Sequence, residues 1–128
     1  METKITHYKD EGYILFKVSG KYKHNEFIEI LGEIKQARQE CTAKSCNILL
    51  DTTKVEDAYT EDYIGKETAQ MQAGLESVEM FEDDMDIKIA AVSSDTSSTN
   101  FGEHVATSRG MDVKVFHAMK EAIAWLLK

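Results

Sequence analysis

The fold class is decided by the last stretch of the chain, 111-MDVKVFHAMKEAIAWLLK-128. Its apolar residues Met111, Val113 and Val115 occupy every second position, which is the period of a strand with one covered face. After Phe116 the apolar residues recur at helical spacing instead. A strand followed directly by a helix is typical of α/β proteins, so we expect this unit to close an α/β domain.

The same patterns predict the elements that precede this unit. Asn25 is the expected N-cap of the first helix, and Gly20 is expected to end the second strand. Strands joined by single helices are parallel neighbours, whereas an N-terminal hairpin is antiparallel. We therefore expect one domain over residues 1–128, with a mixed, mostly parallel sheet of about five strands and four helices in the order β-β-α-β-α-β-α-β-α. The expected strands are 5–8, 13–19, 47–51, 87–92 and 111–116. The expected helices are 25–41, 60–75, a short helix that bears Phe101, Val105 and Ala106 and is ended by Gly110, and 118–128.

Composition limits the classes of partner. The 128 residues suit one domain, and 42% of them are apolar, which is enough for a core. The formal net charge of −8 repels phosphate backbones and anionic lipid surfaces, so we expect no nucleic-acid partner. No apolar run reaches the ~18 residues of a membrane span, and none resembles a signal segment before residue 20. We therefore expect no stable membrane insertion and a cytoplasmic location.

The two cysteines and four histidines do not combine into a metal site, because their spacing matches no zinc pattern. Cys41 and Cys46 are too few for the disulfide scaffold of a small secreted protein. We interpret them as small residues near a helix end and a strand start, in a reduced protein. We expect no metal and no cofactor.

Four segments of the chain stand in an order that is familiar from one family. They are 13-YILFKVSG-20, 48-ILLD-51, 88-KIAAV-92 and the closing unit 113-VKVF-116 with 121-EAIAWL-126. The first is similar to a second strand ending in Ser-Gly, and the second to a central strand ending in aspartate. Together they resemble the bacterial STAS-like family, the SpoIIAA-like anti-sigma-factor antagonists, which are also likened to CRAL-TRIO lipid-binding domains. The resemblance implies a STAS/SpoIIAA-like fold over the whole chain and a regulatory or ligand-carrying role without catalysis.

The resemblance also implies one candidate regulatory residue. In anti-sigma-factor antagonists a serine at the start of the second helix, inside an Asp-Ser-Ser-Gly type turn, is reversibly phosphorylated. Counting from Asp51, that position falls on Thr60, with Tyr59 in place of the aspartate and Glu61 and Asp62 in place of the second serine and the glycine. A phosphate on Thr60 would be stabilised by the helix N-terminus and repelled by the two carboxylates. Thr60 is thus a candidate phosphosite, and the alternative is a plain N-cap.

Hydroxyl side chains follow two of the expected parallel strands, at the carboxyl ends where open α/β sheets bind ligands. The candidate ligand-binding residues among them are Thr52, Thr53, Ser94 and Ser97. The alternative is that such residues gather there because they cap helices. We expect no catalytic residues, because a triad of Ser94, His117 and Asp51 would lack a nucleophile elbow and an oxyanion glycine pair. His117 is expected at the cap of the last helix, where its protonation would oppose the helix dipole.

A third group of candidates is apolar, namely Met71, Met80 and Phe81. Flexible thioethers suit adaptable apolar surfaces, so a flap formed by residues 78–86 could cover a pocket for a lipid-like small molecule. The alternatives are that these residues complete the core beneath an acidic loop, or that they form a homodimer surface. The expected function is therefore a non-catalytic regulatory domain that binds a protein partner, not an enzyme. The alternative function is a small apolar-ligand binding domain.

Overall fold

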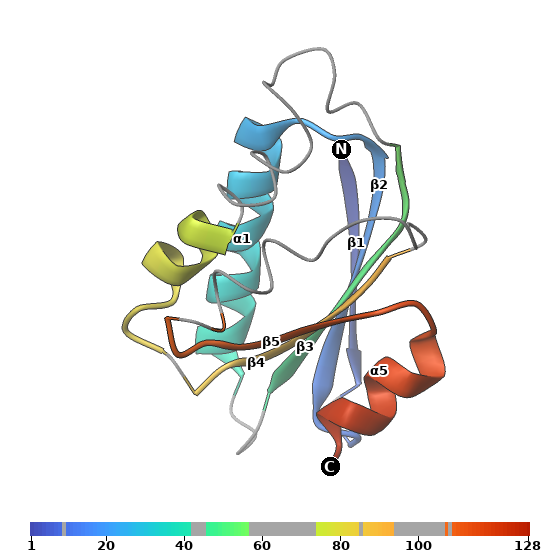
Figure 1. Cartoon of the computed structure of the whole chain (residues 1–128), viewed down its shortest axis with the longest axis vertical. Helices are drawn as coiled ribbons and strands as arrows, with labels where there is room; N and C mark the ends of the chain where they lie inside the picture. Colours follow the sequence, from blue (N-terminus) through green and yellow to red (C-terminus); the bar gives the residue numbers. More distant parts are fainter. Residues whose placement is uncertain (9, 42–45, 57–73, 85, 94–106, 108) are drawn as a thin grey trace.

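The computed structural model of the chain describes residues 1–8, 10–41, 46–56, 74–84, 86–93, 107 and 109–128. In these residues the strands join into one sheet whose order, β1-β2-β3-β4-β5, follows the chain (Figure 1). The β1–β2 pair is antiparallel and every other pair is parallel, which confirms the expected fold class. The elements are β1 (Glu2–Tyr8), β2 (Tyr13–Lys21), α1 (His24–Glu40), β3 (Asn47–Glu56), β4 (Lys88–Val92), β5 (Asp112–Phe116) and α5 (Met119–Leu126), and residues 74–80 are also helical.

Alternation along β2 divides the core into two layers. Phe16 and its apolar neighbours at every second position face α1, and they pack with Ile48 of β3 and Ile34 of α1. Leu15 points to the opposite face, where Leu126 of α5 packs over the sheet. Figure 1 shows α1 and α5 on opposite sides of the strands. Each fully buried aliphatic or aromatic side chain contributes about 1.5–3 kcal/mol, so both layers stabilise the sheet.

The hairpin turn forms where the sequence predicted it. The backbone N–H groups of Glu11 and Gly12 donate to the Tyr8 carbonyl oxygen at 3.1 and 2.9 Å. Gly12 has a φ of 88°, a left-handed conformation that glycine adopts without steric cost. This turn sets Tyr8 opposite Tyr13, and the register of the whole β1–β2 pair follows from it.

Several expected boundaries are wrong. Pairing across the sheet extends strands beyond their local signals, since β1 begins at Glu2 rather than Ile5 and β3 continues past Asp51 to Glu56. The helical residues 74–80 also continue past the expected helix end at Leu75. Gly20 does not end β2, since the strand continues to Lys21 and Gly20 pairs with Val55 of β3. Asn25 is not the N-cap of α1. That position belongs to Lys23, which makes no side-chain cap hydrogen bond.

The cap of the last helix also differs from the expectation. Ala118 is the N-cap of α5, without a side-chain cap hydrogen bond. The His117 ring turns toward β4 instead, and its Nδ1 lies 3.1 Å from the Ser93 carbonyl oxygen. The predicted pH-sensitive cap at His117 is therefore wrong.

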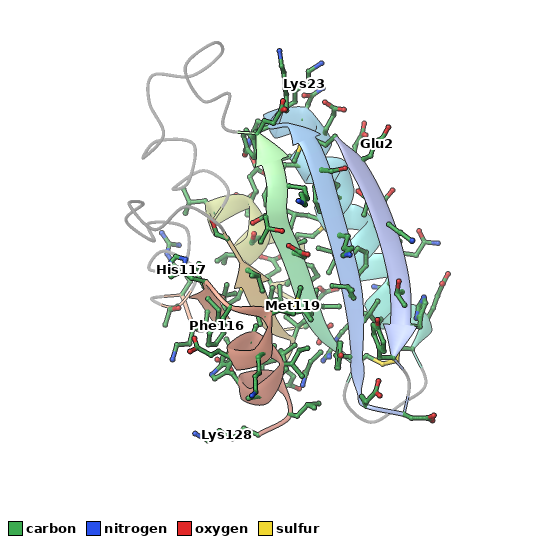
Figure 2. The ribbon with its side chains drawn as sticks, turned by 90° about the vertical axis from the view of Figure 1, so that its right-hand side faces the viewer. Glu2, Lys23, Phe116, His117, Met119 and Lys128 are labelled. Carbon is green, nitrogen blue, oxygen red and sulfur yellow. A yellow bond between two sulfur atoms is a disulfide. The ribbon has the colours of Figure 1, made fainter. Side chains whose placement is uncertain are left out.

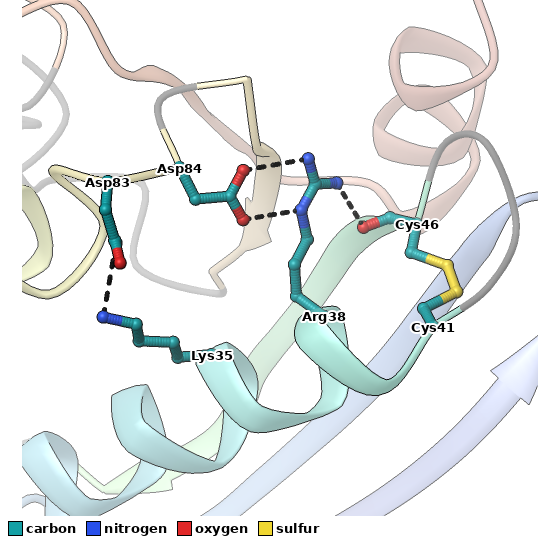
Figure 3. A network of polar contacts seen from close by, with 6 residues as sticks. All are labelled: Lys35, Arg38, Cys41, Cys46, Asp83 and Asp84. Atoms are coloured by element: carbon teal, nitrogen blue, oxygen red, sulfur yellow. Dashed lines mark hydrogen bonds and ion pairs between the residues drawn. A yellow bond between two sulfur atoms is a disulfide. The ribbon is translucent and has the colours of Figure 1, made fainter.

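The two cysteines form a disulfide, with their Cα atoms 6.3 Å apart, whereas we expected reduced thiols. The fold brings them together because the end of α1 and the start of β3 lie side by side (Figure 3). Arg38 reinforces the same corner, since its Nη1 donates to the Cys46 carbonyl oxygen at 2.9 Å. Its Nε and Nη2 donate to the two carboxylate oxygens of Asp84 at 2.9 and 3.2 Å. This bidentate contact ties α1 to the segment that precedes β4.

Phe101, Val105 and Ala106 of the expected short helix and the expected start of the second helix at Thr60 lie outside the described residues. Gly110, which is expected to end the short helix, has the left-handed φ of 96° that suits such an end. Among the described residues, no helix is long and apolar enough to cross a membrane.

Candidate functional site

A β-bulge marks the middle of the central strand. Lys17 of β2 pairs with Asp51 of β3, but Ser19 pairs with Lys54, so β3 contains one residue more than β2 over this interval. The pairing of β3 with β4 stops at the same level, where Asp51 lies opposite Val92. Bulges re-aim side chains and are frequent next to binding sites. The surface around Asp51 is therefore a candidate binding site.

The Asp51 carboxylate holds the bulge together. Its Oδ1 accepts hydrogen bonds from the backbone N–H of Thr53 at 3.0 Å and from the Thr53 hydroxyl at 2.7 Å. Asp51 is only 7% exposed, and among the described residues no other charged residue is buried. Thr52 is held separately, because its hydroxyl donates to the Val92 carbonyl oxygen at 2.7 Å. The bulge is thus rigidified by its own polar side chains.

A groove of about 350 Å³ opens on the sheet face beside this bulge. It lies over β1, β2 and β3, on the face that α5 covers at the other end of the strands (Figure 2). In the described part of the chain, α5 packs against β3, β4 and β5 and leaves this groove uncovered. We call this surface the open face. Its lining residues are Glu2, Thr3, Lys4, Lys17, Val18, Ser19, Asp51, Thr53 and Lys54.

The open face carries two rows of side chains across neighbouring strands. One row consists of Lys4, Lys17 and Asp51, and the next of Glu2, Ser19 and Lys54. Lys4 and Lys17 are both exposed and lie directly opposite each other, which is destabilising for two like charges. The ion pairs among the described residues involve Met1, His24, Lys35 and Arg38, and none involves a lysine of the open face.

A separate ion pair lies near the start of β1. The N-terminal ammonium of Met1 donates to Oε1 of Glu26 at 2.8 Å, and this hydrogen bond holds the pKa of the Glu26 carboxyl below its usual range. Glu26 Oε2 is buried, and no hydrogen-bond partner for it lies among the described residues. In the same residues, no group of three or more histidine, cysteine, aspartate and glutamate side chains is placed to hold a metal ion.

The residues singled out from the sequence end up in different places. Thr53 lines the groove, whereas Thr52 is engaged with β4. Phe81 is 0% exposed in the α1-side core and Met80 packs against that core, which agrees with the interpretation that they complete it. The remaining candidates, Thr60, Met71, Ser94 and Ser97, lie outside the described residues.

Sequence reasoning missed the lysines of the open face, although a signal for two of them was present. A turn that sets Tyr8 opposite Tyr13 also sets Lys4 opposite Lys17, because each step along one strand is matched by a step back along the other. The place of Lys54 could not be found in this way, because it depends on the bulge in β3.

Comparison with known proteins gives a family and a fold. A family model described as SpoIIAA-like matches residues 13–127. A solved structure, that of an uncharacterised protein from the DUF3478 family with a SpoIIAA-like fold from Shewanella loihica PV-4, is similar with a TM-score of 0.58. The similarity covers 98% of this chain and 92% of that chain at 17% sequence identity, and so it shows the fold alone. No curated protein matches the chain.

Proposed function

The chain belongs to the SpoIIAA-like family, and from that premise we propose that it is a non-catalytic regulatory domain that binds a protein partner through the open face. Its proposed place of action is the cytoplasm, the location expected from the sequence. The proposal extends the family resemblance by naming the surface of contact. The proposal includes no catalytic step, because the side chains of Asp51, Thr52 and Thr53 at the bulge are hydrogen-bonded within the fold.

The observation that carries this proposal is that no described element covers one face of part of a parallel strand pair. Parallel strands are almost always covered on both faces, because their connections place helices there. Here β2 and β3 are parallel, and α1 covers one face along with helical residues 74–80. On the other face the described elements leave Lys17, Ser19 and Thr53 lining a groove. A partner seated on the open face would cover the part of the sheet that the described elements leave exposed.

The alternative function, an apolar-ligand carrier, has less support from the described residues. Phe81 and Met80 pack in the core and do not line the groove. The groove itself is bordered by lysines and hydroxyl groups, which suit a polar contact. Protein binding is therefore the function that the described residues favour.

Site-specific photo-cross-linking in extract of the source cells tests the proposal. A photoreactive amino acid replaces Ser19, in the groove, or Gln39, an exposed residue of α1 whose helix packs on the opposite sheet face. We expect one saturable protein adduct from position 19, competed away by unlabelled chain, and none from position 39. No adduct at position 19, or an equal yield at both positions, would overturn the proposal.

A further inference from the structure

We infer that the open face binds an oxyanion, a phosphate or carboxylate group, between Lys4, Lys17 and Lys54. This inference rests on the proposed function and deepens it, because it names the chemical group by which a bound molecule is held. The group is either a free small anion or the same group carried on a partner's side chain.

The two rows concentrate positive charge at one groove. The chain as a whole has a net charge of −8, yet three lysines are gathered on adjacent strands at one groove. Lys4 and Lys17 are direct cross-strand partners, so their ammonium groups repel each other across the β1–β2 pair. An anion seated between them removes that repulsion and gains two charge-assisted hydrogen bonds.

The carboxylates of the groove do not already neutralise these lysines. Asp51 lies next to Lys17 in the same row, but its Oδ1 accepts two hydrogen bonds from Thr53 and its side chain is buried at the base. No ion pair within 4.0 Å joins Asp51 or Glu2 to a lysine among the described residues. Among the described residues the ammonium groups of Lys4, Lys17 and Lys54 therefore have no ion-pair partner, and they are available to an anion in the groove.

The size and the neutral donors of the groove fit a small group. A volume of about 350 Å³ lies at the lower end of the range of about 300–1,000 Å³ found for ligand pockets. Ser19 lies between Lys54 and Glu2 in the second row, and its hydroxyl adds a neutral donor beside the lysines. Asp51 is buried and lines the groove, and its negative charge disfavours deep entry of an anion, so the bound group sits at the mouth of the groove among the three lysines.

NMR titration of the full chain tests this site. Inorganic phosphate, a short phosphoserine peptide and the same peptide without phosphate are added to the protein and to its K17Q and K120Q variants. Lys120 is an exposed residue of α5 outside the groove, so K120Q makes the same change of net charge. Conservation of the remaining amide spectrum shows that each variant is folded.

We expect saturable shifts of the Lys17, Ser19 and Thr53 amides on adding phosphate, with affinity about fivefold weaker in K17Q and unchanged in K120Q. Tighter binding of the phosphopeptide than of phosphate identifies a partner's side chain as the source, and equal binding identifies a free anion. Absence of saturable shifts on the open face, or equal loss in K17Q and K120Q, would overturn the inference. Cross-linking from position 19 without anion binding would overturn this inference alone and leave the proposed function standing.

Discussion

Replacement of Asp51 by alanine tests how the bulge is held. Asp51 accepts two hydrogen bonds, from the Thr53 amide at 3.0 Å and from the Thr53 hydroxyl at 2.7 Å. A hydrogen bond to a charged acceptor contributes about 1.5–3 kcal/mol, and a buried donor left without a partner costs a similar amount. Since Thr53 is half-buried, we expect Asp51→Ala to lower the free energy of unfolding by about 2–4 kcal/mol.

Urea denaturation followed by circular dichroism measures this loss. With a urea dependence of about 2 kcal/mol/M, in the middle of the usual range, the midpoint should fall by about 1–2 M. The matched control is Thr53→Val, which removes the hydroxyl but keeps the amide donor, and we expect it to cost about 1 kcal/mol. Because both changes act on one contact, the double variant should be little less stable than Asp51→Ala alone. A change of less than about 0.5 kcal/mol for Asp51→Ala, which is typical of unimportant surface positions, would refute this account of the bulge.

Three further predictions concern charges and the disulfide. Arg38→Lys keeps the positive charge but loses the bidentate contact with Asp84, so it should lower the free energy of unfolding by about 1–2 kcal/mol in urea denaturation. Equal stability of the variant and the parent would contradict the role of that contact. Reduction of the disulfide between Cys41 and Cys46 should lower the free energy of unfolding by about 2 kcal/mol, measured by urea denaturation with and without dithiothreitol. The stability of a Cys41→Ser variant should not change with the reductant. If the reductant destabilises both proteins, the disulfide is not the cause. The folded pKa of Glu26 lies below its ordinary value of 4.5, so its contribution is present above that pH and is lost as the pH falls through the folded pKa. We therefore compare the melting temperatures of the parent and of Glu26→Gln at neutral pH and at a pH below 4.5. The melting temperature of the parent should fall more than that of the variant on acidification, because only the parent loses the ion pair. An equal fall in both proteins would count against the ion pair.

The strands were predictable because their signal is local. Apolar residues at every second position marked β2 and β5, and the continuous apolar run before Asp51 marked a strand covered on both faces over that length. Single helices between strands then required parallel neighbours, which yielded the correct strand order. These inferences needed no information about distant parts of the chain.

The features that escaped prediction all depend on contacts between distant residues. Gly20 reads as a strand end locally, but its pairing with Val55 continues β2. The disulfide depends on how α1 returns to the sheet, and spacing in the sequence does not show that. The bulge at Asp51 depends on the register between β2 and β3, so the groove beside it could not be foreseen.

The open face as a binding surface is the central claim, and one cross-linking comparison tests it most directly. The photoreactive residue stays at position 19, and the charge of Lys17 is reversed by K17E, with K120E on α5 as the control of equal charge change. We predict a specific protein adduct in the parent and in K120E, and loss of most of that adduct in K17E. An adduct of undiminished yield in K17E, or the absence of an adduct in all three proteins, would contradict the account.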